Sequence, residues 1–437
     1  MARILARDLK DHIGSPVSIS GWLHKKRLLG GLTFINVRDR SGLTQVLIED
    51  KDEVEKLRGM QLGTVLSVTG NVVAEERAPG GAEIHEGVVE VLTPVTYESP
   101  IEIDKAISHQ AEHLDTLFEH RVVSLRNIRE QAVFRIQAAV KEAVRTYLRS
   151  QEFVEFNSPK LLPGSTEGGA EVFKLDYFGK EATLAQSAQF YKQMMVGVFE
   201  RAYEINPTYR AELSATTRHM TEFIHIDAEM GFVNFDELLN LLGELLHTVV
   251  ESVYQSEATS LALWKSAKPL VPVKVPRLKL EDIHTMYEKA TKQTVTDFKD
   301  LTPSEEKWVC EYAKKELGSD AVLVTHWPAS EMKFYHRLDA TDSRYTERAD
   351  LLFCGVEIAT GSMREHRYDV LVDQLVKKTG ADITHPGFHY YLQAFKHGMP
   401  VHGGFGMGLE RLTQKIISLA NVKEASLFPR DINRLAP

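Results

Sequence analysis

The stretch ERAYEINPTYRAELSATTRHMTEFIHIDAEMGF, residues 200–232, contains the clearest strand pattern in the larger part of this chain. Its first segment, ERAYEINP, and its last, FIHIDAEMGF, alternate apolar and polar residues as half-buried strands do. The pattern predicts two antiparallel strands joined by a charged loop. Such a loop can point Arg210, Glu212, Arg218 and His219 into one cleft. A solvated helix face is the alternative for a charge run, and the flanking strands argue against it.

Further toward the N-terminus, residues 13–95 contain five short strand-like segments separated by turn signals: VSISGW, LTFINVRD, LTQVLIE, TVLSVTGNVV and GVVEVLTP. Five such strands carrying basic and aromatic residues predict an OB-fold barrel. The formal net charge of the chain is -9, yet HKKRLLGG, residues 24–31, is locally basic. This segment is either a phosphate-binding patch or a solvated strand end.

The remaining organisation follows from one change of pattern. Residues 101–125 are predicted to be a polar hinge between an N-terminal domain, residues 1–100, and a larger domain, residues 126–437. The larger domain opens with IREQAVFRIQAAVKEAVRTYLRSQ, whose apolar spacing predicts a long helix. FVEFNSPKLL follows as a strand that carries Pro159. Strands and helices then mix without βαβ alternation, which indicates an α+β fold.

The amino-acid composition indicates a globular protein without a disulfide framework or a membrane-spanning segment. A content of 43% hydrophobic and 26% charged residues is typical of a globular chain. Cys310 and Cys354 lie far apart in sequence, which argues against a disulfide framework or a zinc site. The sequence MARILARDLKDH lacks the apolar core of a signal peptide, and no apolar run is long enough to cross a bilayer. We therefore expect a cytoplasmic protein with no membrane partner.

Three segments together carry a family resemblance. The long helix with FVEFNSP, then YRAE with TTRHMTEF, then GGFGMGLER, resemble motifs 1, 2 and 3 of class II aminoacyl-tRNA synthetases, in the same order. With the OB-like domain in front, the chain is most similar to aspartyl-tRNA synthetases of the archaeal type. The resemblance covers essentially the whole chain. It implies an N-terminal anticodon-binding OB-fold domain and a class II catalytic domain with an antiparallel sheet flanked by helices.

The resemblance implies an ATP site built from motifs 2 and 3. Arg210 would stabilise the charge that develops on the α-phosphate. Glu212 would accept from the adenine amino group, and Phe223 would stack on the base. Arg411 would cover the other face of the adenine and reach the γ-phosphate. The expected ATP-binding residues are Arg210, Ala211, Glu212, Arg218, His219, Met220, Phe223, Glu357, Gly408, Leu409, Glu410 and Arg411, with Arg210 and Arg411 catalytic.

The glycines of GGFGMGLER are expected to let the nucleotide lie flat on a strand, because they have no Cβ. The alternative for such a stretch is a tight turn or close backbone packing. ADLLFCGVEIATG, residues 349–361, reads as two strands around a Cys354-Gly355 turn. A two-residue turn places Asp350 and Glu357 on one face, where they suit Mg²⁺ bridging ATP phosphates, with Thr360 nearby as in the family. The alternative is that these acids are structural partners of arginine.

The amino-acid site is expected to bind L-aspartate. AQSAQFYKQ resembles the QxYK segment of the family and supplies Gln189 and Lys192, and GSMREHR supplies Arg364. Two cations that converge on one side chain suit a carboxylate, whereas an amide would leave one cation unpaired. The full set implied for aspartate is Glu167, on a closing glycine-rich loop, with Gln189, Lys192, Arg210, Asp227, Thr360 and Arg364. Met363 also resembles asparaginyl enzymes, and Lys192 favours the aspartyl reading.

The OB-fold domain is expected to read the anticodon. Phe34 and Gln45 match positions where the family stacks on and hydrogen-bonds the central uracil. The alternative for Phe34 is barrel core. His24 resembles members that charge both tRNA(Asp) and tRNA(Asn), which also tend to carry a proline where RAPGG supplies Pro79.

Three functions therefore compete. The first is an aspartate-tRNA ligase that uses ATP and Mg²⁺ and charges tRNA(Asp) and also tRNA(Asn). The second is an asparaginyl enzyme, and the third is a catalytically silent RNA-binding paralogue. The family also implies a homodimer through motif 1. A tRNA-dependent amidotransferase is left open as a further partner.

Overall fold

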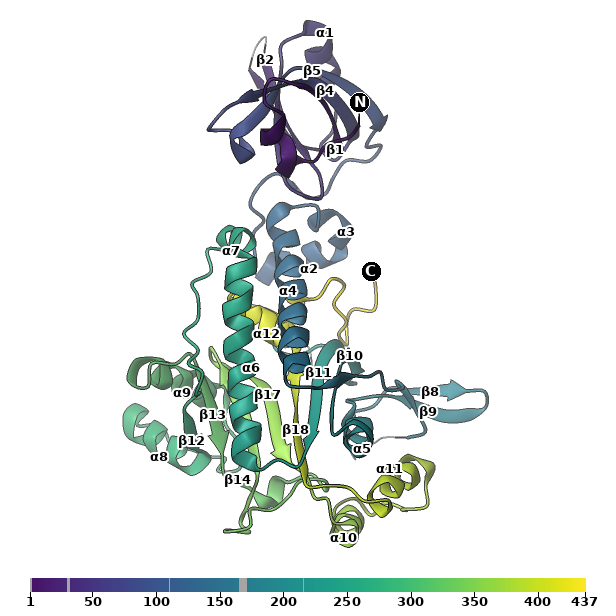
Figure 1. Ribbon diagram of the computed structural model, residues 1–437, viewed down its shortest axis with the longest axis vertical. Coiled ribbons are helices and arrows are strands. Elements are labelled where there is room, and N and C mark those ends of the chain that lie inside the picture. Colours follow the sequence, from purple (N-terminus) through teal and green to yellow (C-terminus); the bar gives the residue numbers. More distant parts are fainter. Residues whose placement is uncertain (1, 30–31, 110, 165–170, 215) are drawn as a thin grey trace. The chain divides into compact units, whose positions relative to one another are not determined.

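The computed structural model describes residues 2–29, 32–109, 111–164, 171–214 and 216–437. The chain divides into two compact units, Met1–Glu130 and Gln131–Pro437 (Figure 1). Each unit has a hydrophobic core of its own, so each is described separately. Among the described residues, no helix is both long enough and apolar enough to cross a membrane.

The first unit contains the predicted barrel. Its strands close in the order β1-β2-β3-β5-β4. Their bounds are β1 (Pro16–Leu29), β2 (Leu32–Arg38), β3 (Leu43–Ile48), β4 (Val65–Ala74) and β5 (Ala82–Thr93), with η1 (Ala6–His12), α1 (Lys51–Arg58) and η2 (Pro79–Gly81) between or before them. Buried and less buried residues alternate along β2 and β3, and Leu23, Ile35 and Val46 are fully buried inside. The OB-fold prediction is confirmed.

The segment expected to be a polar hinge contains two helices instead, α2 (Ala111–Glu119) and α3 (Arg121–Ser124). They form because Leu114, Leu117 and Phe118 make a small apolar cluster against Ile101 and Ile107. Charged residues lie between these apolar positions, so the overall polarity of the segment predicted a hinge although its apolar spacing is that of a helix.

The second unit is built on an eight-stranded sheet in the order β12-β13-β16-β17-β18-β11-β10-β6. Its strands are β6 (Val154–Glu155), β10 (Arg201–Tyr209), β11 (Glu222–Gly231), β12 (Arg277–Lys279), β13 (Ala321–Thr325), β16 (Arg348–Phe353), β17 (Val356–Met363) and β18 (His402–Gly408). Neighbouring strands are antiparallel except for the β10–β6 and β12–β13 pairs at the two edges. The predicted antiparallel sheet with flanking helices is confirmed.

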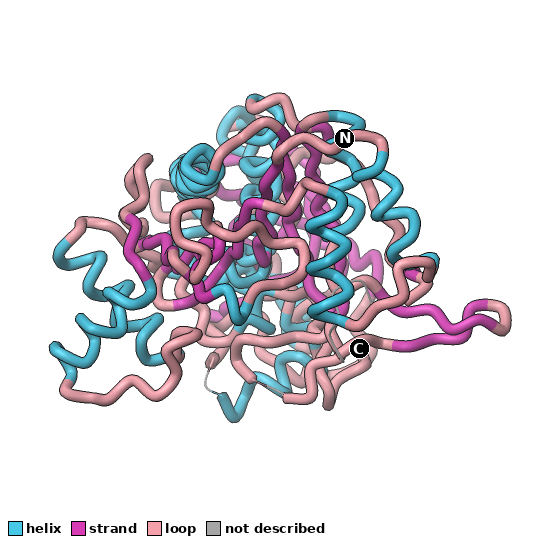
Figure 2. The backbone as a smooth tube through the Cα atoms, turned by 90° about the horizontal axis from the view of Figure 1, so that it is seen from below, coloured by secondary structure: helices cyan, strands magenta, loops and turns pink. Residues whose placement is uncertain are grey.

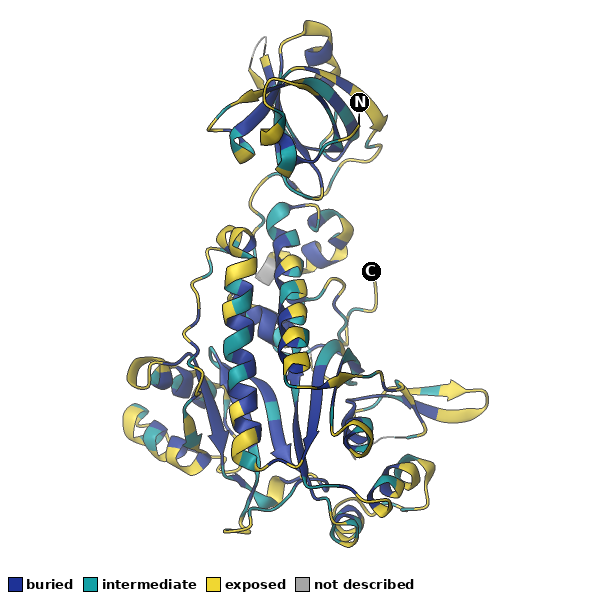
Figure 3. Cartoon of the chain, in the orientation of Figure 1, coloured by how far each residue is buried: buried dark blue, intermediate teal, exposed yellow. Residues whose placement is uncertain are grey.

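Two long helices cover one face of this sheet, α4 (Ile128–Ser150) and α6 (Phe235–Ser256), as Figure 1 shows. The main core lies between them and the sheet, where Ile226, Ala228 and Met230 of β11 pack. Figure 3 shows the central strands as buried. The alternate residues of β11 face away from α4 and α6. That second face of the sheet carries the functional site.

Shorter elements surround the sheet. The helices are α5 (Gln189–Phe199), α7 (Ala258–Trp264), α8 (Leu280–Thr291), α9 (Pro303–Glu316), α10 (Tyr368–Thr379), α11 (Pro386–Lys396) and α12 (Leu409–Ile416), with η3 (Ala329–Glu331) and η4 (Val422–Ala425). The small sheets are β14 (Trp327–Pro328) with β15 (Tyr345–Thr346), and β7 (Leu161–Leu162) with β9 (Lys180–Leu184) and β8 (Lys174–Tyr177). Figure 2 shows the β8–β9 hairpin extending from the rest of the second unit.

The strand expected at FVEFNSPKLL is interrupted. Only Val154–Glu155 and Leu161–Leu162 are strand, and they belong to different sheets. Pro159 lies between them, and proline has no N–H to donate to a strand ladder. The long helix before it is confirmed as α4.

Candidate active site

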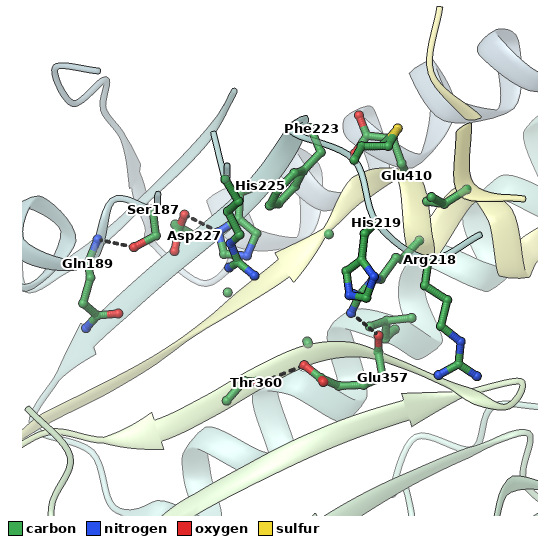
Figure 4. Close-up of a pocket in the computed structure, with 18 of the residues that line it drawn as sticks. Ser187, Gln189, Arg218, His219, Phe223, His225, Asp227, Glu357, Thr360 and Glu410 are labelled. Atoms are coloured by element: carbon green, nitrogen blue, oxygen red, sulfur yellow. Dashed lines mark hydrogen bonds and ion pairs between the residues drawn. The ribbon is translucent and has the colours of Figure 1, made fainter. Parts of the chain in front are cut away.

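A cleft lies on the face of the second unit's sheet that is opposite α4 and α6. Its empty volume, including the space open to solvent, is about 1010 Å³, which is large enough for a nucleotide with an amino acid. Strand β11 runs along it, because residues two apart on a strand share a face and Phe223, His225 and Asp227 all line the cleft. Figure 4 shows these three side chains with residues from the neighbouring strands.

The charged loop of residues 210–221 joins β10 to β11 as predicted. The two strands are antiparallel, and Tyr209 pairs with Glu222 at the point where the loop begins and ends. The backbone N–H of Arg210 donates to the carbonyl of Thr221 at 2.9 Å. Arg210, Glu212, Arg218, His219 and Met220 all line the cleft. The expected convergence of these side chains is confirmed.

The side chains of this loop contact aromatic and acidic neighbours. The guanidinium of Arg210 lies 5.3 Å from the centre of the Phe223 ring, which is a cation–π distance. Arg218 forms an ion pair of 2.5 Å with Glu306 of α9. Burial and the nearby Arg411 lower the pKa of His219. At neutral pH His219 is therefore a neutral hydrogen-bonding group, and the positive charge of this end comes from arginine.

Strand β18 and helix α12 form where GGFGMGLER predicts them. Two of the glycines are required by close packing against a neighbouring strand, and not only by a nucleotide that lies on them. A Cβ at Gly404 would lie 2.1 Å from the carboxylate of Glu229, and a Cβ at Gly406 would lie 2.3 Å from the His225 ring. The alternative of close packing therefore applies to Gly404 and Gly406. These glycines admit two side chains of the neighbouring strand β11.

The hairpin of β16 and β17 has the predicted two-residue turn. Cys354 and Gly355 both have positive φ, 47° and 85°, as a tight hairpin turn requires. A bulge follows, because Leu352 pairs with Glu357 whereas Leu351 pairs with Ala359. The extra residue brings Glu357 and Thr360 to one side although they are three positions apart. The Thr360 hydroxyl donates to Glu357 at 3.0 Å (Figure 4).

The two acids of this hairpin have different surroundings. Glu357 and Thr360 line the cleft, whereas Asp350 lies behind it and pairs with Arg348 at 2.6 Å. Burial, and then the charge of Glu357, raise the pKa of Asp350 to about 7 against the opposing effect of Arg348. Burial opposes ionisation of Glu357 also, but Arg411 and Arg348 outweigh it and lower the pKa of Glu357. Glu357 is therefore the ionised carboxylate that faces the cleft.

The opposite end of the cleft is buried and highly hydrogen bonded. Lys192 of α5 donates to Asp227 at 2.8 Å and to the carbonyl of Phe405 at 2.9 Å. Arg364 donates to both oxygens of Glu229, at 2.8 and 3.1 Å. The Lys192 ammonium is also 3.8 Å from Glu229. The two expected cations thus converge, and each already has a carboxylate partner.

Asp227 is occupied at both oxygens. Oδ1 accepts from Lys192, and Oδ2 lies 2.7 Å from Nδ1 of His225. Burial alone would raise the pKa of Asp227, but His225 and Lys192 outweigh it and the pKa is lowered. In this geometry Asp227 orients Lys192. The α-ammonium role expected for Asp227 would require one of these contacts to be replaced.

Not every expected residue lines the cleft. Leu409 is fully buried in the main core, and Ala211 makes its contact through its backbone N–H, which donates to Glu171. Glu167 lies outside the described residues. The other expected ATP and aspartate residues are cleft residues: Gln189, Lys192, Arg210, Glu212, Arg218, His219, Met220, Phe223, Asp227, Glu357, Thr360, Arg364, Gly408, Glu410 and Arg411.

Several lining residues escaped the sequence analysis. They are Ser187, His225, Tyr335, His336, Ile358, Ala359 and Val422. A signal existed for His225, because it lies two positions from both Phe223 and Asp227 on a strand with clear alternation. Tyr335 and His336 lie in a segment far from the three motifs, and no local pattern marked them.

The expected anticodon residues lie in the first unit. Phe34 alternates with the buried interior residues Thr33 and Ile35, so it belongs to the outer face and not to the barrel core. Asn36 pairs with Gln45 across β2 and β3, which makes Phe34 and Gln45 diagonal neighbours on that face. Gln45 donates to Glu83 at 2.7 Å. An aromatic ring beside amide groups can stack on a base and hydrogen-bond it.

His24 and Pro79 differ from this pair. Pro79 begins η2 and is half-buried. His24 is 5% exposed and lies at a bulge of β1, between Leu23 and Lys25. Burial, together with Arg38, lowers the pKa of His24. In the described residues its Nδ1 atom has no hydrogen-bond partner.

The three cations of the basic segment, Lys25, Lys26 and Arg27, have different surroundings. The ammonium of Lys26 donates to the carbonyls of Leu57, Arg58 and Met60 at 3.0, 2.9 and 2.6 Å. It therefore caps the C-terminal end of α1, where free carbonyls attract a cation. Lys25 and Arg27 pair with Asn36 and Phe34 in the β1–β2 ladder, so they share the outer face with Phe34.

Comparison with known proteins agrees with both units. The family model for tRNA synthetases class II (D, K and N) matches residues 113–432, and the model for the OB-fold nucleic acid binding domain matches residues 17–92. The chain belongs to the class II tRNA synthetases of this D, K and N group. Its substrates are therefore a tRNA, an amino acid and ATP.

Two relatives and one solved structure are similar over the whole length. An aspartate-tRNA(Asp/Asn) ligase of Thermus thermophilus is 41% identical, and one of Archaeoglobus fulgidus is 36% identical, each over 100% of both chains. The structure of asparaginyl-tRNA synthetase from Pyrococcus horikoshii complexed with asparaginyl-adenylate gives a TM-score of 0.90 at 28% identity, again over 100% of both chains. The relatives thus include both amino-acid specificities.

Proposed function

We propose that this chain is an aspartate-tRNA ligase that charges both tRNA(Asp) and tRNA(Asn). It activates L-aspartate with ATP to aspartyl-adenylate and transfers the aspartyl group to the 3' end of the tRNA. The names of the relatives from Thermus thermophilus and Archaeoglobus fulgidus support this specificity. We assign anticodon binding to residues 1–100, the connection to residues 101–125, and catalysis to residues 126–437.

The observation that carries the choice of aspartate is the number of hydrogen-bond donors left at the buried end of the cleft. Lys192 has three N–H donors, and two are used by Asp227 and Phe405. Arg364 has five, and four are used by Glu229, Gly404 and Ser362. Each cation therefore keeps one donor without a partner among the described residues.

Two donors that face one substrate group suit a carboxylate, which only accepts. The side chain of asparagine has one accepting oxygen and a donating nitrogen, so its amide would place a donor against a buried cation. A buried donor left without an acceptor costs about 1–3 kcal/mol, and a site built to hydrogen-bond one group rejects its analogue strongly. This donor count favours aspartate over asparagine.

The nucleotide end supports adenylate formation. The substrate carboxylate is already ionised at neutral pH, so it can attack the α-phosphate without a general base. Arg210 is positioned by the Phe223 ring to stabilise the charge that develops there. Arg218, His219 and Arg411 line the same end and would hold the outer phosphates. Glu212 would accept from the adenine amino group.

We further propose that Mg²⁺ binds with ATP beside Glu357 and Thr360. Mg²⁺ prefers oxygen ligands and is commonly held by one or two carboxylates with substrate phosphates. The ionised Glu357 and the Thr360 hydroxyl fit this requirement, and the Asp350 partnership with Arg348 gives Asp350 an indirect role. In the described residues no group of three or more His, Cys, Asp or Glu side chains is arranged to hold a metal alone. The bound ion would neutralise charge on the phosphate oxygens.

The remaining partners follow from the family. We propose a homodimer through α4 and the two short strands that follow it, where Val154 of β6 and Leu161 of β7 are 41% and 49% exposed although apolar. Light scattering at micromolar concentration tests this, and a stable active monomer would contradict it. We also propose a cytoplasmic location. A tRNA-dependent amidotransferase that acts on charged tRNA(Asn) is a further partner that suits the proposed specificity for both tRNAs.

One experiment separates the three functions. Pyrophosphate exchange is measured with L-aspartate and with L-asparagine, and the purified enzyme is then assayed with tRNA(Asp) and tRNA(Asn) transcripts. We expect exchange with aspartate alone and aspartylation of both tRNAs. Exchange with asparagine would show that the chain is an asparaginyl enzyme, like the similar synthetase from Pyrococcus horikoshii. No exchange with either amino acid would favour the silent RNA-binding paralogue.

A further inference from the structure

A buried chain of hydrogen bonds extends from the amino-acid end of the cleft to the start of β18. It joins Gln189 and Gln193 of α5, Tyr391 of α11, and His402. Gln193 and His402 are fully buried, Tyr391 is 1% exposed, and none of these three lines the cleft. The direction of every donor in this chain can be worked out from one backbone carbonyl.

The carbonyl of Pro400 sets the tautomer of His402. Nδ1 of His402 lies 2.8 Å from this oxygen, which only accepts, so Nδ1 must carry the proton. Burial lowers the pKa of His402 to about 4, so the ring is neutral at physiological pH and its Nε2 is an acceptor.

The tautomer of His402 then sets the two amides. Gln193 lies 3.0 Å from Nε2 of His402 and must present its NH₂ group there, since an oxygen would face a lone pair. The Oε1 atom of Gln193 is thereby turned toward Gln189 and Tyr391, which donate to it at 2.9 and 3.1 Å. Gln189 thus uses its nitrogen in this contact. Its oxygen is on the side of the other lining residues in Figure 4.

We propose that Gln193 and His402 are positioning residues that fix the carboxamide of Gln189 with its oxygen toward the amino-acid substrate, where it accepts from the α-ammonium group. This inference rests on the proposed function for the identity of the substrate. Aspartate has two carboxylates that accept and one ammonium that donates, so an accepting oxygen in the site has only the ammonium as its partner. A reversed amide would place N–H donors against the ammonium.

The variant Gln193→Met tests the assignment, because it keeps the approximate volume and removes both hydrogen-bonding functions. Released from Gln193, Gln189 can turn, and one hydrogen bond to a charged group is lost. We expect the KM for L-aspartate in pyrophosphate exchange to rise about tenfold, with the KM for ATP changed less than about twofold. Inhibition by succinate, which is aspartate without its amino group, should change less than about twofold as well.

Three further variants control the result. His402→Phe removes the acceptor without altering Gln193 and should raise the KM for aspartate in the same way, whereas His402→Gln restores an acceptor and should recover most of the affinity. Tyr391→Phe removes the other donor to the same oxygen and keeps the ring, so its effect should be small. Thermal unfolding and the KM for ATP show whether each variant is folded.

The outcomes are distinct. Equal weakening of aspartate and succinate would overturn the proposal, because a general distortion of the pocket does not depend on the ammonium. An effect of Tyr391→Phe as large as that of Gln193→Met would overturn it too. If the wild-type enzyme activates asparagine, the proposed specificity is wrong. The same test then uses asparagine with succinamate, because the ammonium is common to both amino acids.

Discussion

The amino-acid end of the cleft, around Lys192 and Arg364, is buried and internally hydrogen bonded, whereas the nucleotide end is half-buried. At the first end the two cations already pair with Asp227 and Glu229. At the second, Arg210 lies on the Phe223 ring and Arg411 donates to the carbonyl of Glu357. The amino-acid end is therefore preorganised before substrate arrives, and the arginines of the nucleotide end acquire anionic partners when polyphosphate binds.

This difference predicts that substitutions at the two ends fail in different ways. A change at the buried end leaves a partner charge without its counterion, so it should weaken folding and substrate binding together. A change at the nucleotide end should lower the rate and leave the fold intact. The following predictions test that division in order of decreasing effect.

The largest effect is expected for Lys192→Met. The variant removes a donor to the substrate carboxylate and leaves Asp227 buried without its lysine, each a change of about 3–5 kcal/mol in comparable buried pairs. We expect aspartate-dependent exchange to fall about a thousandfold or more, with a lower melting temperature. Lys160→Met is the matched control, because Lys160 pairs with the buried Glu204 at 2.5 Å outside the cleft. An unchanged KM for aspartate in Lys192→Met would remove this residue from the site.

At the nucleotide end, Arg210→Gln should reduce the rate of adenylate formation about 10²- to 10³-fold, the range for one lost transition-state contact. The melting temperature should stay within about 2 °C of wild type, because Arg210 is only half-buried. Arg201→Gln is the control, because Arg201 begins β10, the strand that leads to Arg210, and lies 5.7 Å from the Phe153 ring. Stopped-flow adenylate formation measures the rate. A loss of stability as large as that of Lys192→Met would show that the two ends of the cleft do not differ in this way.

The acidic hairpin gives a smaller and more specific effect. Glu357→Gln keeps the contact with Thr360 and removes the charge, so we expect the Mg²⁺ concentration for half-maximal exchange to rise about tenfold or more. Asp350→Asn should change this Mg²⁺ concentration much less, because Asp350 lies behind the cleft and pairs with Arg348. A Mg²⁺ titration and thermal unfolding of both variants distinguish the two roles. Equal Mg²⁺ dependence in wild type and Glu357→Gln would contradict metal binding here.

The smallest effect is a dependence of stability on pH. Burial raises the pKa of Glu410 to about 7, although the N–H of Ile224 donates to both of its oxygens. Folded Glu410 binds its proton more tightly than the unfolded chain does. Its contribution to stability is therefore present below the unfolded pKa near 4.5 and is lost as pH rises through about 7.

The variant Glu410→Gln removes this titration and keeps an acceptor for Ile224. We expect it to be more stable than wild type by about 1–3 kcal/mol at pH 8, with little difference at pH 4.5. Urea unfolding at the two pH values measures this difference. A variant that is less stable than wild type at pH 8 would show that the ionised carboxylate is favourable in the fold.

The sequence predicted the parts of this molecule that depend on local alternation. The five barrel strands, the β10–β11 hairpin and the Cys354-Gly355 turn all follow from period-two patterns with turn residues, because side-chain burial on a strand repeats at that period. The cleft-facing loop residues followed from those strands. The segment of α2 was predicted to be a hinge because its overall composition is polar. Its apolar spacing, which does predict a helix, was not used.

Contacts between segments distant in sequence could not be predicted in this way. The bulge that brings Glu357 beside Thr360 depends on the register of β16 with β17, which no local pattern states. The two carboxylates that neutralise Lys192 and Arg364 lie on β11, and the reason for Gly404 and Gly406 is also found there. From the sequence alone, Lys192 and Arg364 are expected as two cations that converge on the substrate side chain. The structure shows two paired cations with one donor left on each.

The contacts of Lys26 change the meaning of the basic segment in the first unit. In terms of counterion release, a cation contributes to the salt dependence of nucleic-acid binding only when it neutralises a phosphate and displaces a condensed ion. Lys26 already neutralises the carbonyl end of α1 through Leu57, Arg58 and Met60. Of the three neighbouring cations, only Lys25 and Arg27 are placed to add to that slope. For a single-stranded anticodon loop, they would together contribute about 1.4 to it.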